Sequence, residues 1–210
     1  RVAYVDLDAH HGDGVEDLFA ADGRVLTISI HEEGRWPGTG ALDDRRDGRA
    51  RNMPVPADIS DAEYGFLVRE AVLPAIARFE PAALVVTCGV DTLAGDPLSR
   101  MRLANVTVWD AVDALVGCGR PAVVLGGGGY NPWTLARAWA GVWGRLGGHG
   151  TARALPAAAQ SLLAPLSVDL IDREDIDPRW LARLDDVRPG GSVRTAIVDL
   201  ARATRCASSG

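Results

Sequence analysis

The side chains best suited to chemistry lie at the start of the chain, where Asp6, Asp8 and His10 follow the apolar residues 2–5. An apolar run this short, rich in valine and soon ended by glycine, predicts a buried strand. Because side chains alternate faces along a strand, the three polar groups should point the same way. Burying them is costly unless something binds them, and two carboxylates with an imidazole suit zinc or ferrous iron. A solvated strand-end loop is the alternative that this stretch alone leaves open.

Two later segments repeat the pattern of a predicted strand that ends in residues able to do chemistry. A strand over residues 83–87 runs toward Asp91, and a strand over residues 121–125 breaks into four glycines followed by Tyr130. The carboxyl ends of parallel strands lie on one rim of a sheet, so we expect these groups to approach the first set. Taken alone, Asp91 could equally be a turn or cap residue.

Together the strand ends predict a metal centre. Asp8, His10 and Asp91 would supply three ligands and leave a fourth position open, which is the arrangement of catalytic zinc sites. The two carboxylates also neutralise the ion. A metal held in this way can activate water and polarise a carbonyl group.

The glycines before Tyr130 indicate close approach of the backbone to a ligand. Gly128 and Gly129 are therefore candidate substrate-binding residues, and the Tyr130 phenol could donate a hydrogen bond to a developing oxyanion. A phosphate-binding loop is the alternative for this run, although no Gly-Lys-Ser/Thr sequence follows it.

The elements that must position these residues alternate between strands and helices. Strands are predicted over residues 2–5, 25–30, 52–55, 83–87 and 121–125. Helices are predicted over residues 13–19, 60–80, 106–116 and 132–146. Asp13 with Glu16 and Ser60 with Glu63 fit the capping-box pattern, and Asn131 fits a helix N-cap. The core-facing stripe of the last helix is expected to contain Leu135, Trp139, Val142, Trp143 and Leu146. This alternation predicts an α/β fold with a mainly parallel sheet flanked by helices.

Composition narrows the class of protein. The net charge of −6 over 210 residues argues against non-specific nucleic-acid binding. No apolar run reaches membrane-spanning length, and nothing resembles a signal peptide. The odd number of cysteines (Cys88, Cys118 and Cys206) argues against a disulfide framework and favours a reducing, cytoplasmic setting. Residues 151–210 are alanine-rich and interrupted by proline, so they are expected to form a peripheral helical extension of a domain over residues 1–150.

Four motifs resemble the zinc-dependent histone deacetylase family, which has the arginase/deacetylase fold. They are residues 4–14 (YVDLDAHHGDG), 36–40 (WPGTG), 89–97 (GVDTLAGDP) and 125–130 (LGGGGY). Residues 130–133 (YNPW) look most like bacterial acetoin-utilisation deacetylases. The resemblance covers residues 1–147 and implies hydrolysis of an acetyl amide, on acetyl-lysine or on an acetylated small amine. It also implies that the chain is the carboxyl-terminal portion of the domain, because it opens without methionine directly on a strand.

The resemblance assigns roles to the residues of the centre. It implies that Asp8, His10 and Asp91 bind zinc and that Tyr130 stabilises the tetrahedral intermediate. Trp36 falls where the family has an aromatic residue on the acyl-lysine tunnel.

Further positions match the family's supporting residues. Asp6 and Asp13 match the acids that orient the paired catalytic histidines, although Asp13 could be only a helix N-cap. A structural potassium site is implied at Asp6, Asp8, His10, Ser29 and Ile30. A second monovalent site is implied at Phe19, Asp22 and Val25.

The general base of the family is a pair of histidines upstream of the first motif, and this chain begins after that position. His11 and His31 are not expected to replace the pair, so the chain alone is expected to be inactive. Two other readings stay open. One is an arginase-like binuclear ureohydrolase, although Gly12 and Gly89 stand where its extra aspartates would be. The other is a module that binds acyl-lysine without turnover.

Overall fold

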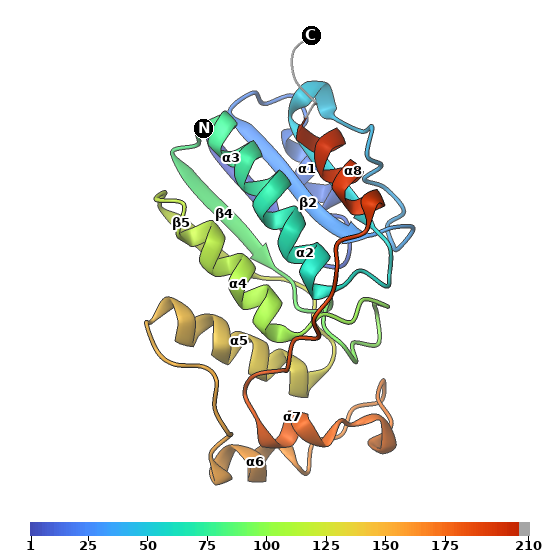
Figure 1. The fold of residues 1–210 in the computed structure, drawn as a ribbon, viewed down its shortest axis with the longest axis vertical. Helices are drawn as coiled ribbons and strands as arrows, with labels where there is room; N and C mark the ends of the chain where they lie inside the picture. Colours follow the sequence, from blue (N-terminus) through green and yellow to red (C-terminus); the bar gives the residue numbers. More distant parts are fainter. Residues whose placement is uncertain (206–210) are drawn as a thin grey trace.

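The computed structural model describes residues 1–205 and shows a five-stranded sheet in which every pair of neighbours is parallel (Figure 1). The strands, in sheet order, are β3 (Ala50–Val55), β2 (Val25–Glu32), β1 (Val2–Asp6), β4 (Ala83–Cys88) and β5 (Ala122–Gly126). The expected α/β fold with a parallel sheet is confirmed. Strand β1 lies at the centre, and its last residue, Asp6, is in register with Ser29 of β2 and Thr87 of β4. The carboxyl ends of the three central strands therefore meet on one rim.

Helices connect the strands and cover the sheet. They are α1 (Asp13–Phe19), α2 (Asp61–Leu67), α3 (Leu73–Phe79), α4 (Asn105–Val116), α5 (Pro132–Leu146), α6 (Ala157–Leu163), α7 (Pro178–Ala182) and α8 (Thr195–Arg205). A π-helical turn, Val68–Val72, joins α2 to α3, so the single helix expected over residues 60–80 is interrupted. The Ser60–Glu63 capping box and the Asn131 N-cap are confirmed.

Two expectations about helices were wrong. Asp13 is the first residue of α1 rather than its cap, and Glu16 is buried against other elements, so they form no capping box. Trp143 and Leu146 are 71% and 44% exposed, so they do not face the core. Helical spacing places both residues close to Val142 on the surface of α5. The neighbouring elements bury only the side of the helix that carries Val142, so Trp143 and Leu146 stay exposed.

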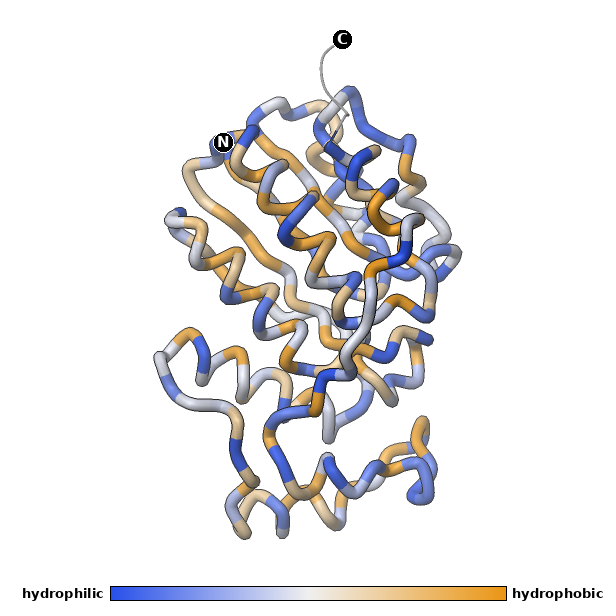
Figure 2. Tube along the Cα trace, in the orientation of Figure 1, coloured by the Kyte–Doolittle hydropathy of each residue, from blue (hydrophilic) through white to orange (hydrophobic). Residues whose placement is uncertain are grey.

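The two faces of the sheet are covered unequally. On the face under α2, α3 and α4, alternate strand residues such as Val5 and Val86 are fully buried, and the hydropathy of these elements matches that burial (Figure 2). On the opposite face of β5, Val123 and Leu125 are 56% and 44% exposed. Strand β5 is also the end of the sheet, and its outer edge pairs with no other strand of residues 1–205.

Residues 151–205 run along the domain before returning to the sheet. Helices α6 and α7 lie near α5, and an extended segment then leads to α8, which packs against β3 and α2 (Figure 1). Trp180 of α7 is buried against Gly95 in the loop after β4. Residues 1–205 contain no helix long and apolar enough to cross a bilayer. Cys88 and Cys118 are free thiols, and Cys206 lies outside the described residues.

Arg194 fixes the start of α8 to the body of the domain. Its guanidinium donates to the buried Glu63 carboxylate at 2.6 and 2.8 Å and to Asp58 at 3.0 Å. These hydrogen bonds lower the pKa of Glu63 from 4.5 to about 2. A depressed pKa in the folded state means that this stabilisation is present above about pH 4.5 and is lost as pH falls toward 2.

We therefore expect Glu63→Gln to lower the free energy of unfolding at pH 7 by about 1–2 kcal/mol, because glutamine keeps the capping box but loses the charge that Arg194 needs. Chemical denaturation of both proteins between pH 2 and pH 7 should show the difference shrinking as Glu63 becomes protonated. Glu70→Gln, which removes the half-exposed partner of Arg205, is the control and should cost less than about 0.5 kcal/mol. A difference independent of pH would contradict the role of the Glu63 charge.

Candidate metal centre

Asp8, His10 and Asp91 converge at the rim formed by β1 and β4. Each offers one ligand atom, and these atoms lie within 4.8 Å of one another. His10 Nδ1 is 3.1 Å from Asp8 Oδ1 and 2.9 Å from Asp91 Oδ2. The structure thus brings together the three residues expected to bind zinc, and their role as ligands stays a prediction.

Backbone amides hold the two carboxylates in place. The Gly128 N–H donates to Asp8 Oδ2 at 2.6 Å, and the Ala9 N–H donates to Asp91 Oδ1 at 2.8 Å. Each carboxylate therefore keeps its other oxygen directed at His10. The structure places Gly128 beneath the centre and Gly129 beside Val90, while their predicted contact with substrate stays a prediction.

The charges of the centre are crowded. Burial and the charge of Asp8 raise the pKa of the Asp91 carboxyl. Burial acts to lower the pKa of His10, but the two carboxylates outweigh it and the pKa is raised. A divalent cation at this position would offset the repulsion between the two carboxylates. It would favour their ionised forms and so oppose the rise in the pKa of Asp91.

Asp6 lies directly behind the centre and is buried. Its Oδ1 accepts from the Asp8 N–H at 3.0 Å and its Oδ2 accepts from the Tyr4 hydroxyl at 2.9 Å. Burial raises the pKa of Asp6 to about 6. Asp13, in contrast, is half-buried in the first turn of α1, where its carboxylate accepts from the Gly14 N–H. The roles predicted for Asp6 and Asp13 toward catalytic histidines stay predictions.

A cavity of about 470 Å³ opens beside the centre. Asp8 and His10 line it together with Trp36 and Tyr130. The Trp36 ring lies 6.5 Å from the His10 ring and is 74% exposed, as an aromatic wall of an open channel would be. The Tyr130 backbone is fixed because its N–H donates to the Asp96 carboxylate at 2.7 Å. The strand pattern predicted Tyr130 at this rim and the family resemblance implied Trp36 there, while the roles of both residues toward substrate stay predictions.

The residues predicted to bind potassium lie in two groups. Asp6 and Ser29 are neighbours across β1 and β2, Ile30 follows Ser29 on β2, and Asp8 and His10 follow β1 at the same rim. Phe19, Asp22 and Val25 lie in the turn between α1 and β2, where the Phe19 carbonyl accepts from Asp22 and the Asp22 carbonyl from Val25. Binding of a monovalent cation at either group stays a prediction.

Sequence reasoning missed a buried polar cluster behind the centre. His11 Nε2 donates to the Glu16 carboxylate at 3.1 Å, and Asn52 Nδ2 donates to the same carboxylate at 2.9 Å. Burial acts to lower the pKa of His11, but Glu16 outweighs it and raises the pKa. The only signal in the sequence was the D-x-x-E spacing of Asp13 and Glu16, which fits a helix cap equally well.

His31 is a buried strand residue, as expected. Its Nε2 donates to the Gly40 carbonyl at 3.1 Å, which leaves Nδ1 to accept from the Ser29 hydroxyl at 2.8 Å. Burial and the charge of His11 lower the pKa of His31 to about 4. The ring is therefore neutral at physiological pH.

Two glycines bear on the arginase-like alternative. A Cβ at Gly89 would collide with Asp8 Oδ2, and a Cβ at Gly12 would collide with Asp6 Oδ2. Carboxylate side chains at these two positions would therefore displace acids already present. This packing argues against a binuclear centre of the arginase type.

Comparison with known proteins assigns the chain to a protein family. Its fold is that of the arginase/deacetylase class, and residues 1–146 match the family described as "Histone deacetylase domain". The chain belongs to the histone deacetylase family. It is 37% identical over 162 residues to Histone deacetylase 8 of Danio rerio and 38% identical over 144 residues to Histone deacetylase RPD3 of Saccharomyces cerevisiae. These matches cover 74% and 66% of this chain but only 43% and 33% of the relatives.

Solved structures match almost the whole chain. A crystal structure of an HDAC homolog from Aquifex aeolicus has a TM-score of 0.89 and 33% sequence identity. A crystal structure of an HDAC homolog complexed with SAHA has a TM-score of 0.88. Each match covers 98% of this chain and 57% of the other chain. The particular likeness to acetoin-utilisation deacetylases stays a prediction.

Proposed function

We propose that the protein carrying this chain is a zinc-dependent deacetylase that hydrolyses the acetyl amide of acetyl-lysine or of an acetylated small amine. The observation that carries the proposal is the convergence of Asp8, His10 and Asp91 at the edge of a cavity that Asp8, His10 and Tyr130 line. Membership of the histone deacetylase family supports the class of reaction. Packing at Gly12 and Gly89 favours one metal ion over two.

The donor set fits the proposed metal. One imidazole nitrogen and carboxylate oxygens within 4.8 Å suit zinc, and also ferrous iron. When bound, zinc supplies a Lewis acid and lowers the pKa of a coordinated water. The contribution of the chain is to fix the ligands, because the amides of Ala9 and Gly128 orient the two carboxylates.

Tyr130 would act on the oxygen of the acetyl group. Burial and the charges of Asp91 and Asp8 raise the pKa of its phenol, so the hydroxyl stays protonated at neutral pH. A protonated phenol can donate a hydrogen bond to the carbonyl oxygen as negative charge develops on it. The Trp36 ring would line the path of the aliphatic chain that carries the acetyl group.

A second candidate is a module that holds an acetyl group without turnover. His10 belongs to the donor set, His11 and His31 are buried and hydrogen-bonded, and His149 is exposed and stacks on Trp143. None of the histidines in residues 1–205 is therefore free at the cavity to act as a general base. That observation favours a binding role for this part of the protein.

An assay of acetate release and peptide binding separates these functions. The zinc-loaded protein is incubated with an acetyl-lysine peptide, acetate is quantified, and binding is followed by fluorescence anisotropy. For a deacetylase we expect acetate release that stops on chelation and returns with zinc. Binding without acetate would establish the second candidate, and urea release from arginine would point to the arginase class. If neither the peptide nor an acetylated small amine such as an acetylated polyamine binds or reacts, both candidates are wrong.

A further inference from the structure

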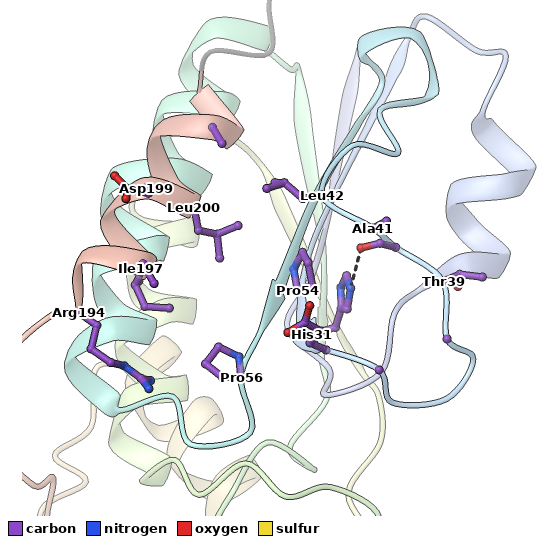
Figure 3. A pocket seen from close by; sticks show the side chains of 16 residues that line it. His31, Thr39, Ala41, Leu42, Pro54, Pro56, Arg194, Ile197, Asp199 and Leu200 are labelled. Atoms are coloured by element: carbon purple, nitrogen blue, oxygen red, sulfur yellow. Dashed lines mark hydrogen bonds between the residues drawn. The ribbon is translucent and has the colours of Figure 1, made fainter.

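The loop that carries Trp36 lies between two cavities. Trp36 lines the cavity at the metal centre, while residues 38–42 line a larger, open cavity of about 790 Å³ that α8 and the end of β3 bound on the other side (Figure 3). Leu200 extends from α8 into this larger cavity (Figure 3). A loop backed by a cavity gains little from packing on that side, so its position depends on the contacts that it makes elsewhere.

Two histidines make those contacts. His11 Nδ1 shares a hydrogen bond of 2.8 Å with Thr39 Oγ1, and His31 Nε2 donates to the Gly40 carbonyl, as the dashed line in Figure 3 shows. Gly40 has a φ of +80°, and a Cβ there would lie 2.6 Å from the His11 ring and 2.7 Å from the His31 ring. The two rings, whose centroids are 4.8 Å apart, therefore enclose the Gly40 backbone.

Both rings are fixed from behind. Glu16 accepts from His11 and is itself held by Asn52, while Ser29 donates to His31. The side chains of His11 and Glu16 are each 2% exposed. Satisfied buried hydrogen bonds of this kind restrict side-chain rotation, so the rings offer a rigid surface to the loop.

We propose that His11 and His31 form a clamp, the histidine clamp, which positions Thr39 and Gly40 and thereby holds Trp36 over the metal centre. Because His11 directly follows His10, the clamp sets the distance between the aromatic wall and the donor set. Both histidines are positioning residues that act through the loop. The inference rests on the proposed function, in which Trp36 lines the path of the acyl-lysine chain.

Two hydroxamates of different length test the clamp on the zinc-loaded protein. Acetohydroxamate and octanohydroxamate share the group that binds zinc, but only the longer one extends far enough to contact Trp36. Thr39→Val keeps the shape of an exposed side chain and removes its hydrogen bond to His11. We expect octanohydroxamate to bind about tenfold more weakly, which is the typical effect of one lost hydrogen bond, while acetohydroxamate binding stays unchanged. Thr39→Ser keeps a hydroxyl for the hydrogen bond to His11, so this variant should bind octanohydroxamate as tightly as the unmodified protein does.

Glycine variants provide a second, independent perturbation. Gly40→Ala drives a Cβ into both rings and should cause the same selective loss. Gly48→Ala is the matched control, because Gly48 has a similar φ of +85° with open space around it, outside the clamp. Equal weakening of the two hydroxamates, no selective loss, or the same loss in Gly48→Ala would overturn the proposal.

Amide hydrogen exchange tests, without any ligand, whether the histidine clamp restrains the loop. The Gly38 N–H donates to the Arg35 carbonyl at 2.7 Å within the loop. Thr39→Val and Gly40→Ala should speed exchange at Gly38 about tenfold, and Gly48→Ala should not. If the unmodified protein binds neither hydroxamate, the proposed function fails, and unchanged exchange at Gly38 would separately overturn the clamp.

Discussion

Tyr130→Phe should lower the turnover of an acetyl-lysine peptide about 100- to 1000-fold, the usual effect of losing one donor to a developing oxyanion. The donor matters most where charge develops, so the loss should fall on kcat much more than on substrate binding. Zinc content should not change, because the phenol of Tyr130 is not part of the donor set. The measurement is steady-state acetate release from the full polypeptide that carries residues 1–210, with zinc determined by elemental analysis.

Tyr64→Phe is the matched control, since it removes a phenol hydroxyl that lies in the core and, among residues 1–205, donates only to the Leu7 carbonyl at 3.5 Å. This variant should keep turnover near that of the unmodified protein. Turnover of Tyr130→Phe within a few-fold of the unmodified protein would show that the hydroxyl does not stabilise the reaction.

The second large effect concerns the metal. Asp91→Ala should weaken zinc binding by more than about 100-fold, because removing a ligand costs more than removing a group that merely orients one. Competition with a chromophoric chelator measures the affinity, and elemental analysis of the unmodified protein should give one ion per chain. Asp43→Ala, at an exposed aspartate outside the cavity, should bind zinc normally.

Two results would count against this centre. Two ions per chain would indicate a binuclear site and revive the arginase-like reading. Zinc affinity that survives Asp91→Ala in a protein with an unchanged circular dichroism spectrum would mean that the ion binds elsewhere.

The donor set could be predicted from sequence because it follows from two strong rules. Alternation predicted that Asp8 and His10 would share a side; both lie in the bend that follows β1, and parallel pairing of β1 with β4 delivers Asp91 to the same rim. Both rules need only short, well-marked strands. The sheet itself was predictable for the same reason, with strand ends displaced by one or two residues.

The supporting contacts could not be predicted, because they depend on partners distant in sequence. Glu16 looks like a cap residue locally, but Asn52 and His11 use its carboxylate in the folded protein. Helical spacing likewise groups Trp143 with the core-facing residues of α5, without showing that the side chain is 71% exposed in the folded chain. The local sequence pattern predicts the direction in which a side chain points. Only the tertiary structure shows which residues that side chain contacts.

The open edge that β5 has in residues 1–205 sets a limit on how this chain can be handled when it is made by itself. Within residues 1–205 the outer edge of β5 pairs with no strand, and Val123 and Leu125 of β5 are exposed, so this edge is a template for strand addition by another chain. During high-level expression, newly made chains would meet such edges before dilution could separate them, and inclusion bodies are the usual outcome. Low temperature and slow induction, which keep the concentration of unpaired edges small, are therefore the conditions under which soluble material should be sought.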